Sequence, residues 1–296
     1  MLKKIPSWVK FLIKAAITLA CLWYVGRKID WLQTWELLKG SKKLWLVLAT
    51  VFFMASKWVS AIRLNLYFKN ISISLSENSN LRLYWLGMFY NLFLPGGIGG
   101  DAYKVILLQR KGIANSYKLT SAAVLLDRIS GVAGLGILAV IGYFLLFKPD
   151  VYAWMVLVAI LPGLLVYYLL LKKFFPSFVS SFSPTLLLGL GVQLLQVLCT
   201  WCLMLSVGIQ HHFLAFQFIF LLSSIVAILP FPIGGLGARE IVFLWGASQF
   251  GLDQHEAVYV SLLFYLVTVL VSLVGLIWVY RDPLEVTVDG DSLQSK

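Results

Sequence analysis

The sequence is poor in charged residues and in cysteine. Only 12% of its 296 residues are charged, and 60% are hydrophobic, whereas soluble domains carry about 25% charged residues. So few charges cannot cover the surface of a soluble enzyme of this length, and the composition excludes that class. The three cysteines (Cys21, Cys199 and Cys202) all lie within apolar runs, which excludes the disulfide framework of a small secreted protein.

Recognisable catalytic and cofactor motifs are also missing. Cys199 and Cys202 form a C-x-x-C pair without a second pair of ligands nearby, and the three histidines lack the H-E-x-x-H spacing of a zinc site. The sequence has no G-x-S-x-G motif, and no glycine cluster is followed by the Gly-Lys-Ser/Thr of a nucleotide-binding loop. We therefore predict a protein that is not an enzyme and that uses no metal or other cofactor.

Basic residues outnumber acidic residues by 24 to 13, which gives a formal net charge of +11. Such an excess fits a nucleic-acid partner, an anionic lipid surface or the cytoplasmic loops of a membrane protein. The apolar composition favours the last two. We therefore expect membrane lipids and no nucleic acid as partners.

Six apolar runs are long enough to cross a hydrocarbon layer of about 30 Å, which takes about 20 helical residues. They lie at residues 11–25, 44–66, 119–147, 151–171, 184–208 and 258–280. The first run follows four lysines but lacks the small-residue cleavage pattern of a signal peptide, so we predict a retained anchor. The sequence thus predicts a single transmembrane domain over residues 1–296, with a tail at 281–296.

Two further apolar runs end in clusters of glycine and proline instead of polar loops. The run at 83–94 leads into Pro-Gly-Gly-Ile-Gly-Gly-Asp, and the run at 213–229 leads into Pro-Phe-Pro-Ile-Gly-Gly-Leu-Gly. A helical pattern resumes after each cluster, so we predict re-entrant hairpins over 83–111 and 213–249. Such broken backbone is tolerated at membrane depth only where protein or a water-filled cavity satisfies it.

The two hairpins belong to an internal repeat. In each half one span precedes the hairpin and another follows it, which gives repeats over 44–147 and 184–280. The single span at 151–171 inverts the second copy. The predicted fold is therefore an all-α polytopic membrane protein with about six transmembrane helices and two re-entrant helical hairpins in inverted repeat, an architecture of many secondary transporters.

The distribution of basic residues predicts the orientation. With both termini in the cytoplasm, most Lys and Arg residues, Arg63 among them, fall on the cytoplasmic side, as the positive-inside rule requires. We predict the cytoplasmic (inner) membrane, with cytoplasmic N- and C-termini. Trp31, Leu32, Trp35 and Leu38 have the spacing of a helix that lies in the membrane interface.

Polar residues within the apolar runs are the first candidates for function. Asp127 and Arg128 lie about 12 to 13 Å deep at 1.5 Å per residue, where a charge costs on the order of 2.5–3.5 kcal/mol. Either Asp127 or another carboxylate neutralises Arg128, or Arg128 faces a polar cavity and binds an anionic head group. Lys57 either lines the same cavity or pairs with a carboxylate. Gln193 and Gln196 serve helix packing or ligand binding.

The glycine clusters are the second candidates. A half-helix that starts after such a cluster presents unpaired N–H groups and the positive end of its dipole, which suits a phosphate. The alternative is that glycine only allows tight packing of each hairpin. Aligning the clusters places one cation at each break. The predicted binding residues are Gly97, Gly99, Gly100, Asp101 and Lys104 in the first hairpin, and Gly234, Gly235, Gly237, Arg239 and Glu240 in the second.

With these motifs the chain resembles the lysylphosphatidylglycerol synthase transmembrane-region family, also called flippase-like integral membrane proteins. The resemblance is carried by residues 91–104, 124–128 and 229–240, and it covers nearly the whole chain. Larger members join this region to a soluble domain that aminoacylates phosphatidylglycerol, and the membrane region is regarded as moving the modified lipid. The resemblance implies a lipid-translocating role for the charged residues and glycine breaks named above, without the synthase activity.

One stretch departs from the family pattern. The last span of the family often has an arginine in a Leu-Tyr-Arg-Leu-like stretch, whereas this chain reads Leu-Phe-Tyr-Leu at 263–266. We predict a lipid translocase that binds the anionic head group of a phospholipid or polyprenyl-phosphate lipid between the hairpins. Two other classes fit the same features: a membrane partner of a lipid-modifying enzyme or glycosyltransferase, and a small-solute secondary transporter.

Overall fold

The computed structural model describes residues 31–93, 98–147, 151–228 and 238–284, and all regular secondary structure within these ranges is helical. In chain order the elements are α2 (Trp31–Gly40), α3 (Lys43–Lys69), α4 (Glu77–Phe93), α5 (Gly99–Arg110), α6 (Tyr117–Leu146), α7 (Val151–Val158), α8 (Ile160–Phe174), η2 (Pro176–Ser181), α9 (Phe182–Ser206), α10 (Phe213–Ile228), α11 (Ala238–Phe250), α12 (Gln254–Leu273), η3 (Val274–Leu276) and α13 (Ile277–Tyr280).

Five helical stretches of the described chain are long and apolar enough to cross a membrane. They are Lys43–Lys69, Tyr117–Leu146, Trp154–Phe174, Pro176–Ser206 and Gln254–Tyr280. Five of the six predicted spans and the all-helical polytopic fold are thereby confirmed. The predicted span at 11–25 lies outside the described residues, as does the tail from residue 285 on.

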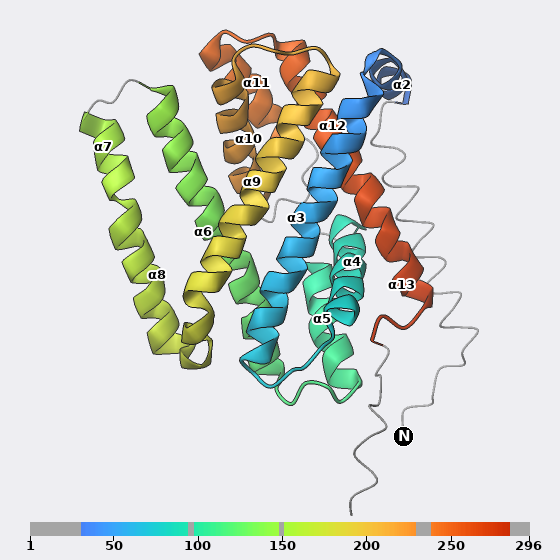
Figure 1. Ribbon diagram of the computed structural model, residues 1–296, viewed down its shortest axis with the longest axis vertical. Helices are drawn as coiled ribbons and strands as arrows, with labels where there is room; N and C mark the ends of the chain where they lie inside the picture. Colours follow the sequence, from blue (N-terminus) through green and yellow to red (C-terminus); the bar gives the residue numbers. More distant parts are fainter. Residues whose placement is uncertain (1–30, 94–97, 148–150, 229–237, 285–296) are drawn as a thin grey trace, which may run out of the picture.

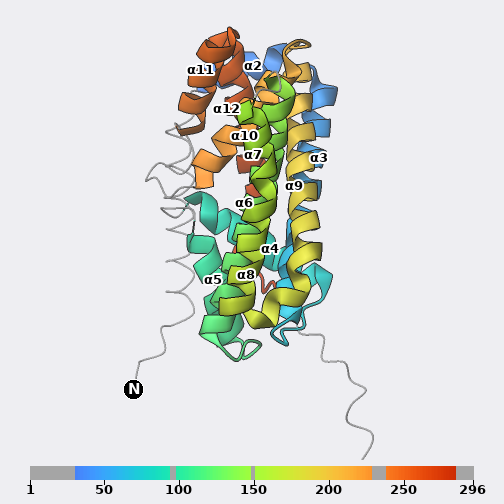
Figure 2. The same ribbon diagram turned by 90° about the vertical axis from the view of Figure 1, so that its left-hand side faces the viewer.

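The spanning helices pack side by side. α3 lies along α9, which also packs against α6. Figure 1 shows α7 and α8 at one edge of the bundle and α12 with α13 at the other. α2 lies across the upper end of the bundle in both views (Figures 1 and 2), which confirms a helix where the Trp and Leu spacing predicted one.

Two helices begin at residues that cap their first turn. The Ser116 side chain accepts a hydrogen bond from the Leu119 amide at the start of α6, and the Asp253 carboxylate accepts one from the Glu256 amide at the start of α12. Such caps satisfy amides that have no partner within the helix. They fix where these two spans begin.

Four shorter helices complete the bundle. α4 packs against α5, and α10 packs against α11. In Figure 1 the first pair lies in the lower half of the molecule and the second pair lies in the upper half, and Figure 2 agrees. Residues 94–97 and 229–237, which hold the centres of both glycine clusters, lie outside the described residues. The re-entrant hairpins and the inverted repeat therefore stay predictions.

The apolar core is divided along α3. Near its start, Ala49 and Phe53 join a large buried cluster with residues of α9, α10, α11 and α12. Near its end, Leu64, Tyr67 and Phe68 join a second cluster with residues of α4, α5 and α6. Ser56, Lys57, Ser60 and Arg63 lie between these two stretches of α3.

An ion pair outside the spans joins α5 to α13. Lys111 follows α5 and pairs with Asp282, which follows α13. Burial raises the pKa of the Asp282 carboxyl, and hydrogen bonds from the Lys111 side chain and the Leu284 amide lower it, so that the net pKa lies below its ordinary value. The carboxyl is therefore charged at neutral pH and holds the two helix ends together.

Candidate functional site

A polar cavity of about 280 Å³ lies among α3, α4, α5, α6 and α9, with the last residue of α10 at its edge. Four cations and two carboxylates line it, which leaves two positive charges in excess. Polar neutral residues and a few apolar ones complete the lining. The charged residues are Lys57, Arg63, Lys104, Arg128, Asp101 and Asp127, and the neutral ones include Ser60, Tyr84, Asn91, Gln193 and Gln196.

Asp101 is shared by two cations. It is buried in the first turn of α5, where Lys104 follows it at i+3 and approaches its Oδ1 at 3.0 Å. The Nε of Arg128, on α6, pairs with its other oxygen. Arg128 is thus neutralised by Asp101 and not by Asp127, and it also faces the cavity, because its side chain is 32% exposed. The structure brings these predicted residues together.

A second ion pair crosses from α3 to α6. Arg63 Nε lies 2.7 Å from Asp127 Oδ1, and both side chains are less than a tenth exposed. Arg63, which the charge count placed on the cytoplasmic side, is thus a buried residue of α3. Its position inside the apolar run at 44–66 was the signal that could have identified it.

Lys57 lines the cavity without a carboxylate partner among the described residues. It lies near the middle of α3, about 20 Å from either end at 1.5 Å per residue. Its Nζ lies 4.4 Å from the centroid of the Phe53 ring, a cation–π contact. Its positive charge is the least compensated one in the cavity.

Gln193 joins two helices and also lines the cavity. Its Nε2 donates to the Gly131 carbonyl at 3.2 Å, which joins α9 to α6, and the residue lines the cavity. Gln196 lines the same cavity one turn further along α9. The two side chains thus form a polar face opposite Lys57 and Arg63.

The amides at the start of α5 are already bonded. The Gly100 N–H donates to Asn91 Oδ1 at 2.8 Å, and the N–H groups of Asp101 and Ala102 donate to the Ile98 carbonyl. These three amides are not the unpaired donors that the glycine break led us to expect. The positive potential of the cavity therefore comes from side chains.

Gly100 is held against Gly87 of α4. A Cβ at Gly100 would lie 1.9 Å from the Gly87 carbonyl oxygen, a distance that forces α4 and α5 apart. Overpacking of this kind costs about 1–3 kcal/mol. We expect Gly100→Ala to lower the melting temperature of the detergent-purified protein by several degrees. Gly136→Ala is the matched control, because a Cβ there meets nothing within 4 Å; equal melting temperatures for both variants would contradict this packing.

The predicted residues of the second break lie apart from the cavity lining. Arg239, in the first turn of α11, donates to the hydroxyls of Ser223 and Ser224 at 3.3 and 3.2 Å. Glu240 accepts from Ser261 at 3.3 Å. Arg239 forms no ion pair within the described residues. The other residues predicted for the breaks, Gly97, Gly234, Gly235 and Gly237, lie outside those residues, while Gly99 begins α5.

An aromatic contact connects the cavity to Arg239. Phe53, which lies under Lys57, meets Phe264 of α12 edge to face with ring centroids 5.5 Å apart. The Arg239 guanidinium lies 4.9 Å from the centroid of the Phe264 ring. Both rings are buried. The ring pair is therefore in contact with one cation from each predicted repeat.

Comparison with known proteins identifies the family of this chain. The family model described as the lysylphosphatidylglycerol synthase TM region matches residues 11–275. The chain belongs to this family. A relative, the UPF0104 membrane protein PH1989 of Pyrococcus horikoshii, is 24% identical to this chain over an alignment of 310 residues, gaps included. The alignment covers 87% of this chain and 91% of the relative. No solved structure matches the chain.

The family match contains the whole cavity. Every residue that lines it lies between 57 and 228, well inside the matched range. The match is to the membrane region named for the synthase and includes all five described spans except the end of the last. The chain is thus a multi-pass membrane protein of the lysylphosphatidylglycerol synthase TM region family.

Proposed function

We propose that this protein binds the anionic head group of a membrane lipid in the polar cavity and moves the lipid between the two leaflets. The observation that carries the proposal is the excess of two positive charges in a cavity lined by three membrane-spanning helices, α3, α6 and α9, and by the short helices α4 and α5. Charges at this depth are expensive and usually mark a ligand path. A negatively charged head group offsets them.

Arg128 is the first ligand in this proposal, because it faces the cavity while Asp101 holds its Nε. Lys104 shares Asp101 and contributes to the same positive potential. Arg63 and Asp127 neutralise one another and keep α3 against α6. The lipid character of the ligand is supported by the family, which is named for a lipid-modifying synthase.

Movement across the bilayer is supported by the placement of the short helices. α4 and α5 lie in one half of the molecule and α10 and α11 in the other (Figure 1), as two re-entrant hairpins in inverted repeat require. Rocking of such repeats about a central site gives alternating access. In this mechanism Arg239, which lies against the Phe264 ring, receives the head group from the cavity. With both termini in the cytoplasm, the first hairpin faces the cytoplasm.

Transport in proteoliposomes tests this proposal. The full chain is reconstituted with head-group-labelled phosphatidylglycerol or phosphatidylcholine, and protection of the label from an external quencher reports its movement. We expect faster movement of the anionic lipid, and about a tenfold loss in Arg128→Ala, since a charge-assisted hydrogen bond contributes about 1.5–3 kcal/mol. Lys118→Ala removes an exposed cation from the same helix and is expected to leave the rate unchanged.

The other outcomes separate the remaining classes. Equal rates for the wild type and Arg128→Ala would remove Arg128 from the mechanism. Selective binding of the anionic lipid without movement would favour a membrane partner of a lipid-modifying enzyme. Movement of a soluble anion but of no lipid would favour a small-solute transporter and overturn the lipid proposal.

A further inference from the structure

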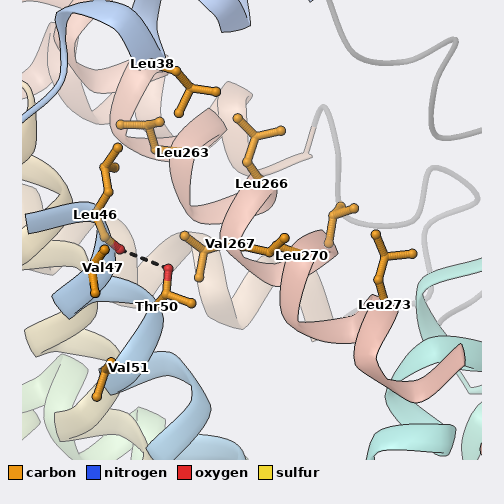
Figure 3. A pocket seen from close by; sticks show the side chains of 11 residues that line it. Leu38, Leu46, Val47, Thr50, Val51, Leu263, Leu266, Val267, Leu270 and Leu273 are labelled. Atoms are coloured by element: carbon orange, nitrogen blue, oxygen red, sulfur yellow. Dashed lines mark hydrogen bonds between the residues drawn. The ribbon is translucent and has the colours of Figure 1, made fainter. Parts of the chain in front are cut away.

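A larger, apolar groove lies between α3 and α12 (Figure 3). Its volume is about 590 Å³, and its walls are aliphatic except for one threonine. The Thr50 hydroxyl donates to the Leu46 carbonyl at 2.9 Å, so it offers the groove no free donor. Leu263, Leu266 and Leu270 of α12 form the opposite wall. The groove therefore suits a hydrocarbon chain and no polar ligand.

The groove and the polar cavity lie on one face of α3. Leu46, Thr50, Phe53, Lys57 and Ser60 follow each other at intervals of three or four residues, which places them in one stripe along the helix. The first two line the groove and the last two line the cavity. Phe53 lies between them, against Phe264 of α12.

The dimensions of the groove match one leaflet. Its wall on α12 runs from Leu263 to Leu273, which is about 15 Å at 1.5 Å per residue. The hydrocarbon core of a bilayer is about 30 Å thick, so the groove is about as long as one leaflet is deep. Thr50 and Lys57 are two turns apart, about 10 Å along the helix, a separation smaller than the depth of one leaflet.

We propose that this groove binds an acyl chain of the lipid whose anionic head group occupies the polar cavity at Lys57. The inference rests on the proposed function and adds to it a site for the tail. Because the surrounding bilayer is as apolar as the groove, burial of the chain there gains little free energy. The head group therefore decides which lipid class occupies the groove. Phe53 and Phe264 lie between the groove, which holds the tail, and the cavity, which holds the head group.

Photo-crosslinking of the full chain in liposomes tests this site. Phosphatidylglycerol and phosphatidylcholine carry the same diazirine on the same acyl chain, and adducts are mapped by mass spectrometry. We expect adducts in the groove to be about tenfold more abundant with phosphatidylglycerol, as one charge-assisted contact implies. Adducts at exposed Leu187 of α9 and Leu165 of α8, far from the groove, are expected to be equal for both lipids.

Two substitutions make the test specific. Lys57→Met is expected to abolish the excess of phosphatidylglycerol adducts in the groove, whereas Lys118→Met, at an exposed position of α6, is expected to preserve it. Leu266→Trp fills the groove from α12 and is expected to reduce the groove adducts without changing the transition temperature. Leu187→Trp, at an exposed position of α9, is its matched control.

Any of four results would overturn the inference. Equal groove adducts from both lipids would show ordinary annular lipid. Adducts on residues 11–25 with none in the groove would assign the groove to that segment. Selective transport of phosphatidylglycerol with no selective adducts in the groove would refute the tail site and leave the proposed function standing. Loss of head-group preference in both transport and crosslinking would refute the proposed function itself.

Discussion

Replacing Asp127 with alanine is expected to lower the free energy of unfolding by about 3–5 kcal/mol, the usual cost of removing one partner of a buried ion pair. The reason is that Arg63 stays buried when its carboxylate is gone. Its Nε lies 2.7 Å from Asp127 Oδ1, and neither side chain reaches a tenth of its full exposure. Unfolding in mixed detergent micelles, followed by tryptophan fluorescence, measures the loss.

A double substitution separates the charge from the packing. Arg63→Met with Asp127→Leu removes both charges and is expected to regain most of the stability, because no charge is then left unpaired. Lys69→Ala removes the exposed ion pair with Glu77, whose atoms are 3.4 Å apart, and is expected to cost less than about 1 kcal/mol. A loss in Asp127→Ala as small as in Lys69→Ala would show that the buried pair does not hold α3 to α6.

Lys57→Met is expected to have the opposite profile, with a large effect on ligand binding and little on folding. Within the described residues no carboxylate pairs with Lys57, so its removal leaves no buried anion unpaired. The lost interaction with an anionic head group is worth about 1.5–3 kcal/mol, which is a 10- to 100-fold weaker affinity. Native mass spectrometry with phosphatidylglycerol and phosphatidylcholine measures this ratio.

The control for this substitution keeps the charge. Lys57→Arg is expected to preserve the preference for phosphatidylglycerol, and Lys57→Met is expected to lose it while its unfolding transition stays at the wild-type position. An unchanged preference in folded Lys57→Met would place the head group elsewhere in the cavity. A transition shifted as far as in Asp127→Ala would mean that Lys57 has a structural role.

The spans could be predicted from the sequence because their signal is local. An apolar run of about 20 residues reports the thickness of the bilayer by itself, and five of the six runs appear as helices in the described chain. The cost of a charge within such a run also identified Asp127, Arg128 and Lys57 as candidates. Each of these three lines the polar cavity.

The partners of these charges could not be predicted, because they depend on how the helices pack. Asp127 and Arg128 are adjacent in sequence, but neighbouring residues on a helix point about 100° apart and do not face each other. Asp127 therefore meets Arg63, 64 positions earlier, and Arg128 meets Asp101, 27 positions earlier. No periodicity in the sequence reports contacts at such separations.

The glycine cluster before α5 also predicted only part of the local structure. The glycine cluster correctly indicated a helix after the break, but α5 begins within the cluster, at Gly99, and not after it. It could not show that Asn91, at the end of α4, accepts a hydrogen bond from the Gly100 amide. A side chain from across the break thus supplies an acceptor at the place where a ligand phosphate was expected.

The carboxylate of Asp101 has a consequence for selectivity. Because it is bound to Lys104 and Arg128, a ligand that enters the cavity competes with an anion that the protein itself provides. Under the proposed function, a weakly charged or neutral group loses that competition, and a phosphate binds only if it offers Arg128 and Lys104 acceptors as good as this carboxylate. Under this proposal Asp101 sets the least strength with which a ligand must bind the two cations. Each time a ligand oxygen replaces a carboxylate oxygen, the connection between α5 and α6 changes.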